Sequence, residues 1–373
     1  MNQSKDHTFY VNGRFLTRPS SGVERVAIEL IISLANRSDT KEIILLTPMK
    51  GILHLDWMNA LEENIRSKIT IQRVGPFTGH IWEQLVLPLV SVRGYLLNFC
   101  STGPILRRRQ LVMIHDAQVW DAPESYSWPF KFLYRLIIPF LAQNAEIIAT
   151  ASDTSARRLE KLGIAPPGKL IVVNNGADHI LRIVADYSVF ERIKLTCHNY
   201  IIAIGSLAPH KNLRLLIRAA GNRPEQAPEL IIVGGLNKKI FLDADLDELP
   251  GVRFVGRVTD EELRALYEGA IALAFPSKTE GFGLPPVEAM LCGCPVIATT
   301  GGAVPEVCGD AVIYADPDDT DAWTEALTEI AANSQLRFNL IERGYIRAKR
   351  YNWIAAAETV LRAVPLRKGL PSD

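Results

Sequence analysis

Short apolar runs, mostly β-branched, alternate with longer amphipathic segments along the whole chain. We expect each run to form a buried strand, because polar or turn residues bound it on both sides. Seven runs lie in the first half, at 8–12, 42–47, 68–73, 95–100, 110–115, 146–150 and 169–173. Six lie in the second half, at 201–204, 230–233, 252–255, 271–275, 296–299 and 311–314. Apolar strands separated by helices indicate an α/β protein with parallel sheets covered on both faces.

The clearest helical pattern follows the first expected strand. Its apolar positions recur at helical spacing and predict a core-facing stripe of Val23, Val26, Ala27, Leu30, Ile31 and Leu34. The polar positions between them predict a solvent-facing side of Glu24, Arg25, Glu29 and Ser33.

A chain of 373 residues is too long for one compact core, so we expect two domains. Turn chemistry at 174–178 ends the first series of strands, and periodicity stays weak until residue 199. We therefore place the first domain at 1–185 and the second at 196–351. Each should be a doubly wound, Rossmann-like unit.

Composition excludes several classes of protein. The 41 basic and 41 acidic residues balance, so no global charge favours nucleic acid. Five cysteines at irregular spacing do not indicate a disulfide framework, and Cys292 and Cys294 are too close for the usual zinc pair. We expect both to be small buried side chains and no metal site. Without an apolar N-terminal run or a spanning segment, we expect a cytoplasmic protein.

Residues 280–290 carry the strongest chemical signal. Gly281 and Gly283 permit a tight turn after the strand at 271–275, and two prolines then suit the first turn of a helix. Strand, glycine turn and helix N-terminus together form a site prepared for an anion. Glu280 precedes the turn, and Glu288 is expected in the first helical turn. One carboxylate can hold a sugar and the other a ribose. The alternative is a helix cap and a surface glutamate.

The segment from Glu280 to Glu288 resembles the Glu-x7-Glu signature of glycosyltransferase family four, the retaining GT-B enzymes. Further matches are 204–213, 294–298, 301–306 and the first-domain ends at 152–159 and 173–176. The resemblance covers nearly the whole chain and is strongest from 200 to 317. It implies two Rossmann-like domains facing a central cleft, the first on the acceptor side and the second binding the nucleotide sugar. It also implies that helix 352–373 packs back on the first domain.

The resemblance also implies roles for individual residues. Lys211 and a helix N-terminus would neutralise the leaving diphosphate, so no metal or other cofactor is expected. Glu280 would orient the sugar. The implied donor-binding residues are Gly22, Gly205, Ser206, His210, Arg257, Val258, Phe282, Gly283, Leu284 and Glu288. Many relatives carry arginine where this chain has Ser206, which leaves the second positive contact open between His210 and Arg257.

Two features of the first domain also match. Residues 20–25 resemble a glycine loop that faces the donor phosphates, with an ordinary helix cap as the alternative. His115 ends a strand, and by resemblance it reaches the donor sugar; a structural hydrogen bond is the alternative. Residues 82–84 are expected in the core and at the acceptor-side surface.

A basic run, Arg107 to Arg109, precedes an aromatic and basic segment at 128–135. Two interpretations stay open for this segment. It either touches an anionic membrane or a lipid-linked acceptor, or forms a solvated turn and a core helix. The first would place the protein at the inner face of the membrane.

We expect a retaining hexosyltransferase that uses a GDP-, UDP- or dTDP-linked sugar, with a mannosyl-like unit favoured. The acceptor would be a glycan or a lipid-linked molecule in cell-surface polysaccharide synthesis. A nucleotide-sugar epimerase of the same fold and a non-catalytic two-domain sugar-binding protein remain alternatives. A nicotinamide dehydrogenase is disfavoured, because no G-x-G-x-x-G follows the first strand.

Overall fold

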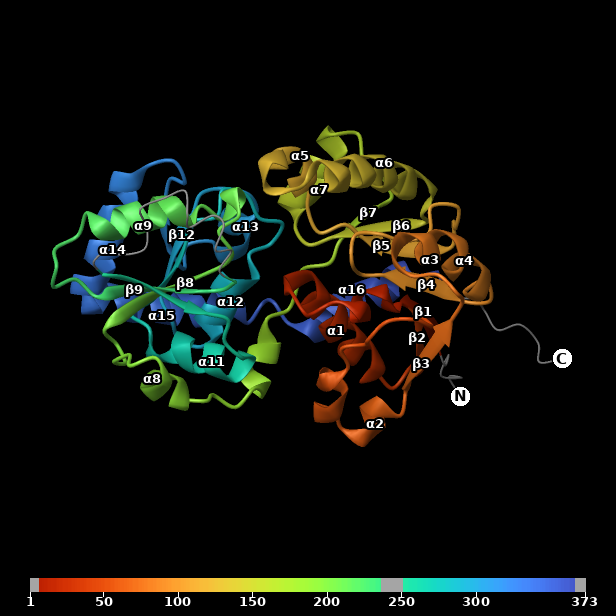
Figure 1. Cartoon of the computed structure of the whole chain (residues 1–373), viewed down its shortest axis with the longest axis horizontal. Helices are drawn as coiled ribbons and strands as arrows, with labels where there is room; N and C mark the ends of the chain where they lie inside the picture. The colour runs from red at the N-terminus through yellow and green to blue at the C-terminus, as the bar shows by residue number, and fades with distance from the viewer. Residues whose placement is uncertain (1–6, 236–250, 366–373) are drawn as a thin grey trace. The chain divides into compact units, whose positions relative to one another are not determined.

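The computed structural model describes residues 7–235 and 251–365. The chain forms two compact units (Figure 1). Unit 1 comprises 1–117, 128–176 and 353–373, and unit 2 comprises 118–127 and 177–352. The sequence placed the first domain at 1–185 and the second at 196–351, whereas unit 2 includes residues 118–127 and its main part begins at Ala177. The last part of the expected helix 352–373 lies outside the described residues.

Unit 1 contains a parallel sheet in the order β3-β2-β1-β4-β5-β6-β7. Each of the seven predicted strands is present, with ends shifted by a few residues at most. The strands are β1 (His7–Asn12), β2 (Thr40–Pro48), β3 (Ile69–Val74), β4 (Tyr95–Asn98), β5 (Gln110–Met113), β6 (Ile147–Thr150) and β7 (Leu170–Val172).

Helices connect and cover these strands. They are α1 (Gly22–Ala35), α2 (Glu63–Arg66), α3 (Gly79–Leu85), α4 (Leu87–Val90), α6 (Trp128–Asn144), α7 (Asp153–Lys161) and α16 (Trp353–Ala363), with short turns η1 (Gly13–Thr17) and η2 (Asp56–Ala60). None of the described helices is long and apolar enough to cross a bilayer.

The predicted solvent-facing side of α1 is wrong. The core stripe is buried as expected except for the half-buried Val23, but Glu24, Glu29 and Ser33 are buried too. Helices α16 and α2 pack against α1 in addition to the sheet, so more than one side of α1 is covered. The sequence pattern of one helix does not reveal a partner more than 300 residues away in the chain.

Unit 2 contains a second parallel sheet in the order β10-β9-β8-β11-β12-β13. All six predicted strands are present. They are β8 (Tyr200–Ile204), β9 (Glu229–Val233), β10 (Val252–Gly256), β11 (Ala272–Phe275), β12 (Val296–Thr299) and β13 (Ile313–Ala315).

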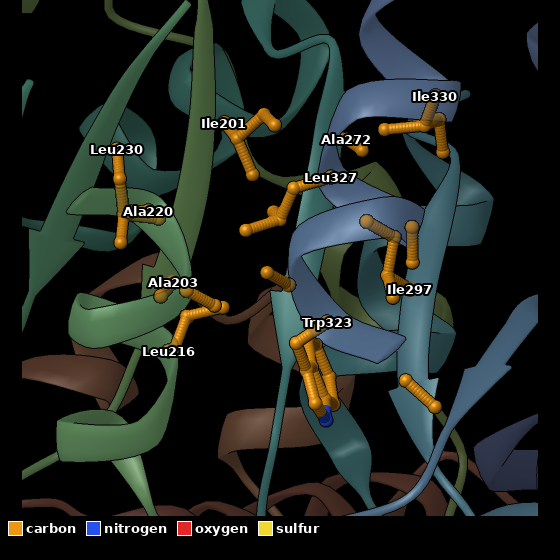
Figure 2. Close-up of a cluster of buried hydrophobic side chains, with 14 of the residues drawn as sticks. Ile201, Ala203, Leu216, Ala220, Leu230, Ala272, Ile297, Trp323, Leu327 and Ile330 are labelled. Carbon is orange, nitrogen blue, oxygen red and sulfur yellow. The ribbon is translucent and has the colours of Figure 1, made fainter. Parts of the chain in front are cut away.

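Helices α9 and α14 close one face of this sheet. Figure 2 shows Leu216 of α9 and Trp323 and Leu327 of α14 in the same buried cluster as Ile201 of the sheet. The longer helices of the unit are α9 (Leu213–Gly221), α11 (Asp260–Gly269), α12 (Leu284–Leu291), α14 (Thr320–Ala332) and α15 (Ser334–Ala348). The shorter elements are α5 (Gln118–Asp121), η3 (Pro123–Ser125), η4 (Asp178–Arg182), α8 (Ser188–Arg192), η5 (Pro209–Lys211) and α13 (Val304–Cys308).

Each sheet has a point where the strand order reverses, between β1 and β4 in unit 1 and between β8 and β11 in unit 2. In open parallel sheets, ligands bind outside the carboxyl ends of the strands at such a point. The loops after β8 and β11 are therefore where the fold places a binding site in unit 2.

Candidate functional site

The loop after β8 carries Lys211. Gly205 has a φ of +152° and lies under the aliphatic part of the Lys211 side chain, 3.6 to 3.7 Å from where a Cβ would stand. A Cβ on Gly234, which follows β9, would clash with the carbonyl of Gly205. Two neighbouring strand ends therefore pack backbone to backbone, and only glycine allows that approach.

The loop after β11 carries Glu280. Its carboxylate accepts a hydrogen bond from Lys211 Nζ at 2.7 Å, and both side chains are only partly exposed. The structure thus brings together the two residues that the sequence singled out for catalysis in unit 2, although they are 69 positions apart.

The turn at Gly301 and Gly302 supports the Glu280 loop. The amide of Ala303 donates to the carbonyl of Glu280 at 3.0 Å. A Cβ on Gly302, whose φ is +61°, would approach that carbonyl to 2.7 Å. Both glycines therefore allow this turn to lie directly on the backbone that carries Glu280.

Helix α12 begins as the sequence predicted. Gly283 is its N-cap at a φ of +89°, and Leu284 is the first helical residue. Pro285 and Pro286 have no N–H, so at most the amides of Gly283 and Leu284 face an anion at this end. The positive end of the helix dipole adds to them. The side chain of Phe282 turns inward instead, edge-on to Tyr351 at 5.2 Å between ring centroids.

Glu288 lies in the second turn of α12, one turn later than expected, because the helix starts only at Leu284. It is buried, and both of its oxygens have partners. Tyr267 OH donates to Oε2 at 3.1 Å, and His179 Nε2 lies 3.1 Å from Oε1. Sequence reasoning missed both partners, which come from η4 and α11 and carry no motif.

Residues 118–127 precede α6 in the chain but pack within unit 2. Ser125 Oγ lies 2.9 Å from His210 Nδ1, and Tyr126 stacks on the His210 ring at 6.3 Å. Gln118 accepts from Tyr126 OH and donates to the carbonyl of Thr279. This arm therefore contacts both loops, next to Lys211 on one and next to Glu280 on the other.

The environment of His210 bears on the open choice of a second cation. Burial, and then the charge of Lys211, lower the pKa of His210. A lowered pKa leaves the ring neutral at neutral pH. Arg257 is exposed, and its guanidinium lies near Gly235 at the end of β9. Ser206 is exposed and Val258 half-buried on the same side of the sheet ends.

Gly22 is the first residue of α1, after a capping box formed by Ser21 and Glu24. Its φ is not in the left-handed region, and a Cβ there would meet nothing within 4 Å. Neither the backbone nor the packing of unit 1 requires glycine at this position. The helix cap therefore explains why serine and glutamate stand at positions 21 and 24, but it does not explain why glycine stands at position 22.

His115 is buried at the end of β5, and its Nε2 lies 2.7 Å from the carbonyl of Phe99. Because a carbonyl only accepts, Nε2 carries the proton. Burial is the main cause that lowers the pKa of His115. His115 thus makes the structural hydrogen bond that was the alternative to a role in binding, and its contact with a sugar stays a prediction.

Unit 1 also holds a buried polar network at its own switch point. Glu83 is fully buried and accepts from Asn12, Arg14 and Thr102, at 2.7, 3.0 and 3.0 Å. His80 Nδ1 lies 3.1 Å from its second oxygen. Burial alone would raise the pKa of Glu83, but His80, Arg14 and Asn12 together hold it below its ordinary value. The expected core position of residues 82–84 is confirmed for Trp82 and Glu83.

Two side chains of the basic and aromatic segment are buried: Arg107 departs from both interpretations, and Tyr134 fits the core-helix interpretation. Arg107 is buried and donates to the carbonyls of Ser91 and Gly94, so it adds no charge to the surface. Tyr134 is buried and stacks on Phe130 at 3.9 Å.

Among the described residues no His, Cys, Asp or Glu cluster could hold a metal ion. Cys294 is buried as predicted, whereas Cys292 is partly exposed. Burial raises the pKa of the Cys292 thiol to about 12.

Comparison with known proteins identifies the family. The model of "Glycosyl transferases group 1" matches residues 190–347. The chain is 27% identical to "O-antigen chain mannosyltransferase B" of Escherichia coli over 93% of this chain and 97% of that protein. It is 31% identical to a "D-inositol 3-phosphate glycosyltransferase" of Corynebacterium jeikeium over 77% and 78%.

Among solved structures, Anabaena Alr3699/HepE in complex with UDP and glucose superposes with a TM-score of 0.71 at 18% identity, over 96% of this chain and 99% of that one. This likeness bears on the fold, and the predicted GT-B class of two α/β units is confirmed. The family model and the curated relatives show that the chain is a glycosyltransferase and belongs to the glycosyl transferases group 1 family.

Proposed function

We propose that this enzyme transfers a hexosyl unit, most favourably mannosyl, from a nucleotide diphosphate sugar to a glycan or lipid-linked acceptor in cell-surface polysaccharide synthesis. The name of the Escherichia coli relative supports the mannosyl unit and the polysaccharide. The nucleotide and sugar bound by Anabaena HepE support the class of donor.

The observation that carries this proposal is the 2.7 Å contact between Lys211 and Glu280. An ammonium group attracts a phosphate, and a carboxylate accepts hydrogen bonds from sugar hydroxyls. A molecule with its phosphate next to its sugar satisfies both groups at once. In a nucleotide sugar, the bond between these two parts is the bond that transfer breaks.

The positive groups at the site would stabilise charge on the departing diphosphate. Lys211 supplies a full charge, and the Gly283 and Leu284 amides supply donors at the positive end of α12. The structure favours Arg257 over a neutral His210 as a second cation. Positive side chains in these places would do the work that a divalent metal does elsewhere.

We propose transfer with retention by attack on the same face of the sugar. The bond from the anomeric carbon to the phosphate oxygen breaks, and a bond to the acceptor oxygen forms on that face. The acceptor proton goes to the departing diphosphate. Glu280 orients the sugar, Glu288 the ribose, and Gly22 and His115 are predicted to contact the donor from unit 1.

A donor screen tests the class of substrate. Thermal shift with UDP, GDP and dTDP would identify the base, and NMR of the product made with the matching sugar would give its anomeric configuration. An inverted product contradicts retention, and a changed sugar without an acceptor indicates epimerisation.

The Lys211→Ala variant tests the assignment of the charge. We expect kcat with saturating donor to fall by about a hundredfold or more, because a full charge at the leaving group is lost. Lys278→Ala is the matched control, since Lys278 is an exposed lysine on the Glu280 loop that pairs with Asp318. Equal activity of the two variants would contradict the assignment.

A further inference from the structure

Helix α6 in unit 1 is apolar on two faces. One face is buried in the unit and comprises Tyr134, Ile137, Ile138, Leu141 and Ala142. The other carries Trp128, Phe132, Leu136 and Phe140, which are 71%, 60%, 49% and 51% exposed. We call these four residues the α6 stripe. They recur every four positions and extend over about 18 Å at 1.5 Å per residue. A helix that is apolar all round is normally buried on all sides.

Neighbouring elements of unit 1 also expose apolar side chains. The ring of His80 on α3 meets Tyr134, on the buried face of α6, edge-on at 5.8 Å, so α3 contacts that face. The exposed apolar side chains on α3, on α4 and in the loops that follow α4 and β4 are Ile81, Leu85, Leu89, Val92 and Leu106. Arg107 ties the loop of Leu106 to the turn after α4 through its bonds to Ser91 and Gly94.

Charge on these segments has one sign. Residues 75–109 and 128–145 contain a single one of the chain's 41 acidic residues, Glu83, and it is fully buried. The exposed charged side chains there are Arg93, Arg108 and Arg135, and Arg109 and Lys131 are half-buried. In a chain of zero net charge, this is a local separation of charge.

We propose that the α6 stripe and its flanking cations bind the surface of an anionic lipid bilayer, with α6 lying in the plane of the interface. Aromatic and apolar side chains with interspersed Lys and Arg are what such a surface binds. A second copy of the chain fits poorly, because a two-fold contact would bring two basic patches together. The inference deepens the proposed function, on which it rests, by assigning the lipid contact of an enzyme with a lipid-linked acceptor to named residues.

Vesicle sedimentation of the full-length protein tests the surface. The probes are vesicles of phosphatidylcholine with phosphatidylglycerol and vesicles of phosphatidylcholine alone. We expect binding to the anionic vesicles that weakens as salt rises. Phe132→Ser with Leu136→Ser should reduce partitioning about tenfold or more. Lys131→Gln with Arg135→Gln should reduce it about twenty-five-fold, at roughly fivefold per cation.

Matched controls come from exposed positions in unit 2. Phe338→Ser with Ile346→Ser removes two apolar side chains of α15 that are 55% and 69% exposed. Lys349→Gln with Arg350→Gln removes two exposed cations that follow it. These variants should bind vesicles as the unaltered protein does. Circular dichroism and the thermal midpoint establish that each variant folds.

Each remaining outcome overturns the inference. It fails if the unaltered protein does not bind anionic vesicles, or if stripe and control variants bind equally. It also fails if the stripe instead mediates a dimer that sedimentation velocity detects and that Phe132→Ser with Leu136→Ser abolishes. Transfer to a detergent-solubilised acceptor is measured without vesicles. Transfer without vesicle binding refutes the inference alone, and vesicle binding without transfer refutes the proposed function alone.

Discussion

Replacing Gly302 by alanine would test whether the backbone position of Glu280 matters for transfer. Gly302 has a φ of +61°, and a Cβ there would lie 2.7 Å from the carbonyl oxygen of Glu280 and closer still to its amide nitrogen. Ordinary van der Waals contact begins at 3.4 Å. Because both contacts are to backbone, the loop of Glu280 must move by about 0.7 Å or more.

Two contributions set the expected size of the effect. A non-glycine residue in the left-handed region costs about 1–2 kcal/mol, and overpacking adds about 1–3 kcal/mol. The free energy of unfolding should therefore fall by about 2–5 kcal/mol. A misplacement approaching 1 Å at a reacting centre lowers rates by up to about a hundredfold. We expect kcat to fall by about ten- to a hundredfold in the folded variant.

The Gly163→Ala variant separates the effect of backbone strain from the effect of moving the Glu280 loop. Gly163 follows α7 with a φ of +68°, and a Cβ there would meet nothing within 4 Å. It should lose stability by the backbone contribution alone and keep its kcat. Urea denaturation and donor-saturated transfer are measured for both variants. If Gly302→Ala lost no more stability than Gly163→Ala and kept its kcat, the reasoning about the Glu280 loop would be refuted.

Three further predictions concern single side chains. Gly22→Ala should raise the free energy of unfolding by about 0.4–1 kcal/mol, because the φ and the surroundings of Gly22 accept alanine. The same variant should raise the donor KM, and an unchanged KM would contradict contact between Gly22 and the donor. Tyr267→Phe should lower the free energy of unfolding by about 1–3 kcal/mol, because the buried Glu288 loses a hydrogen-bond donor. It should also raise the KM for the nucleotide sugar more than it lowers kcat. Equal KM values for the variant and the unaltered protein would leave Glu288 without a role in binding the nucleotide sugar. Stability measured by urea denaturation at several pH values should fall in acid as Glu83 is protonated. Its folded pKa lies below its ordinary 4.5, so its stabilisation is present above that value and is lost as pH falls through the folded pKa. A Glu83→Gln variant with the same slope of stability against pH would contradict this.

The strands were predictable because their signal is local. Each of the thirteen runs is apolar over consecutive positions, and a buried parallel strand needs nothing else. The turn before α12 was predictable for a similar reason, since glycine and proline restrict the backbone wherever they stand. The buried side of α1 was not predictable, because its cover comes from α16 at the other end of the chain.

The site residues also differ in whether a local sequence signal predicts them. Glu280 and Lys211 stand in motifs that the sequence displays, and the fold brings them together because both loops leave the sheet at its switch point. His179 and Tyr267 became visible only when tertiary structure placed them on Glu288. The arm at 118–127 could not be predicted either, because its contacts are to residues that follow by 85 and 161 positions.

That arm gives the donor loops a common support. Ser125 and Tyr126 hold His210 on the first loop, and Gln118 holds Thr279 on the second. The amide of Lys278 also donates to the carbonyl of His210, at 2.8 Å, and so joins the loops directly. The Lys211–Glu280 pair is partly exposed, and an exposed ion pair alone contributes little to stability. The hydrogen bonds behind the pair therefore fix the distance between its charges, and the neutral ring of His210 suits a structural place beside an ammonium group.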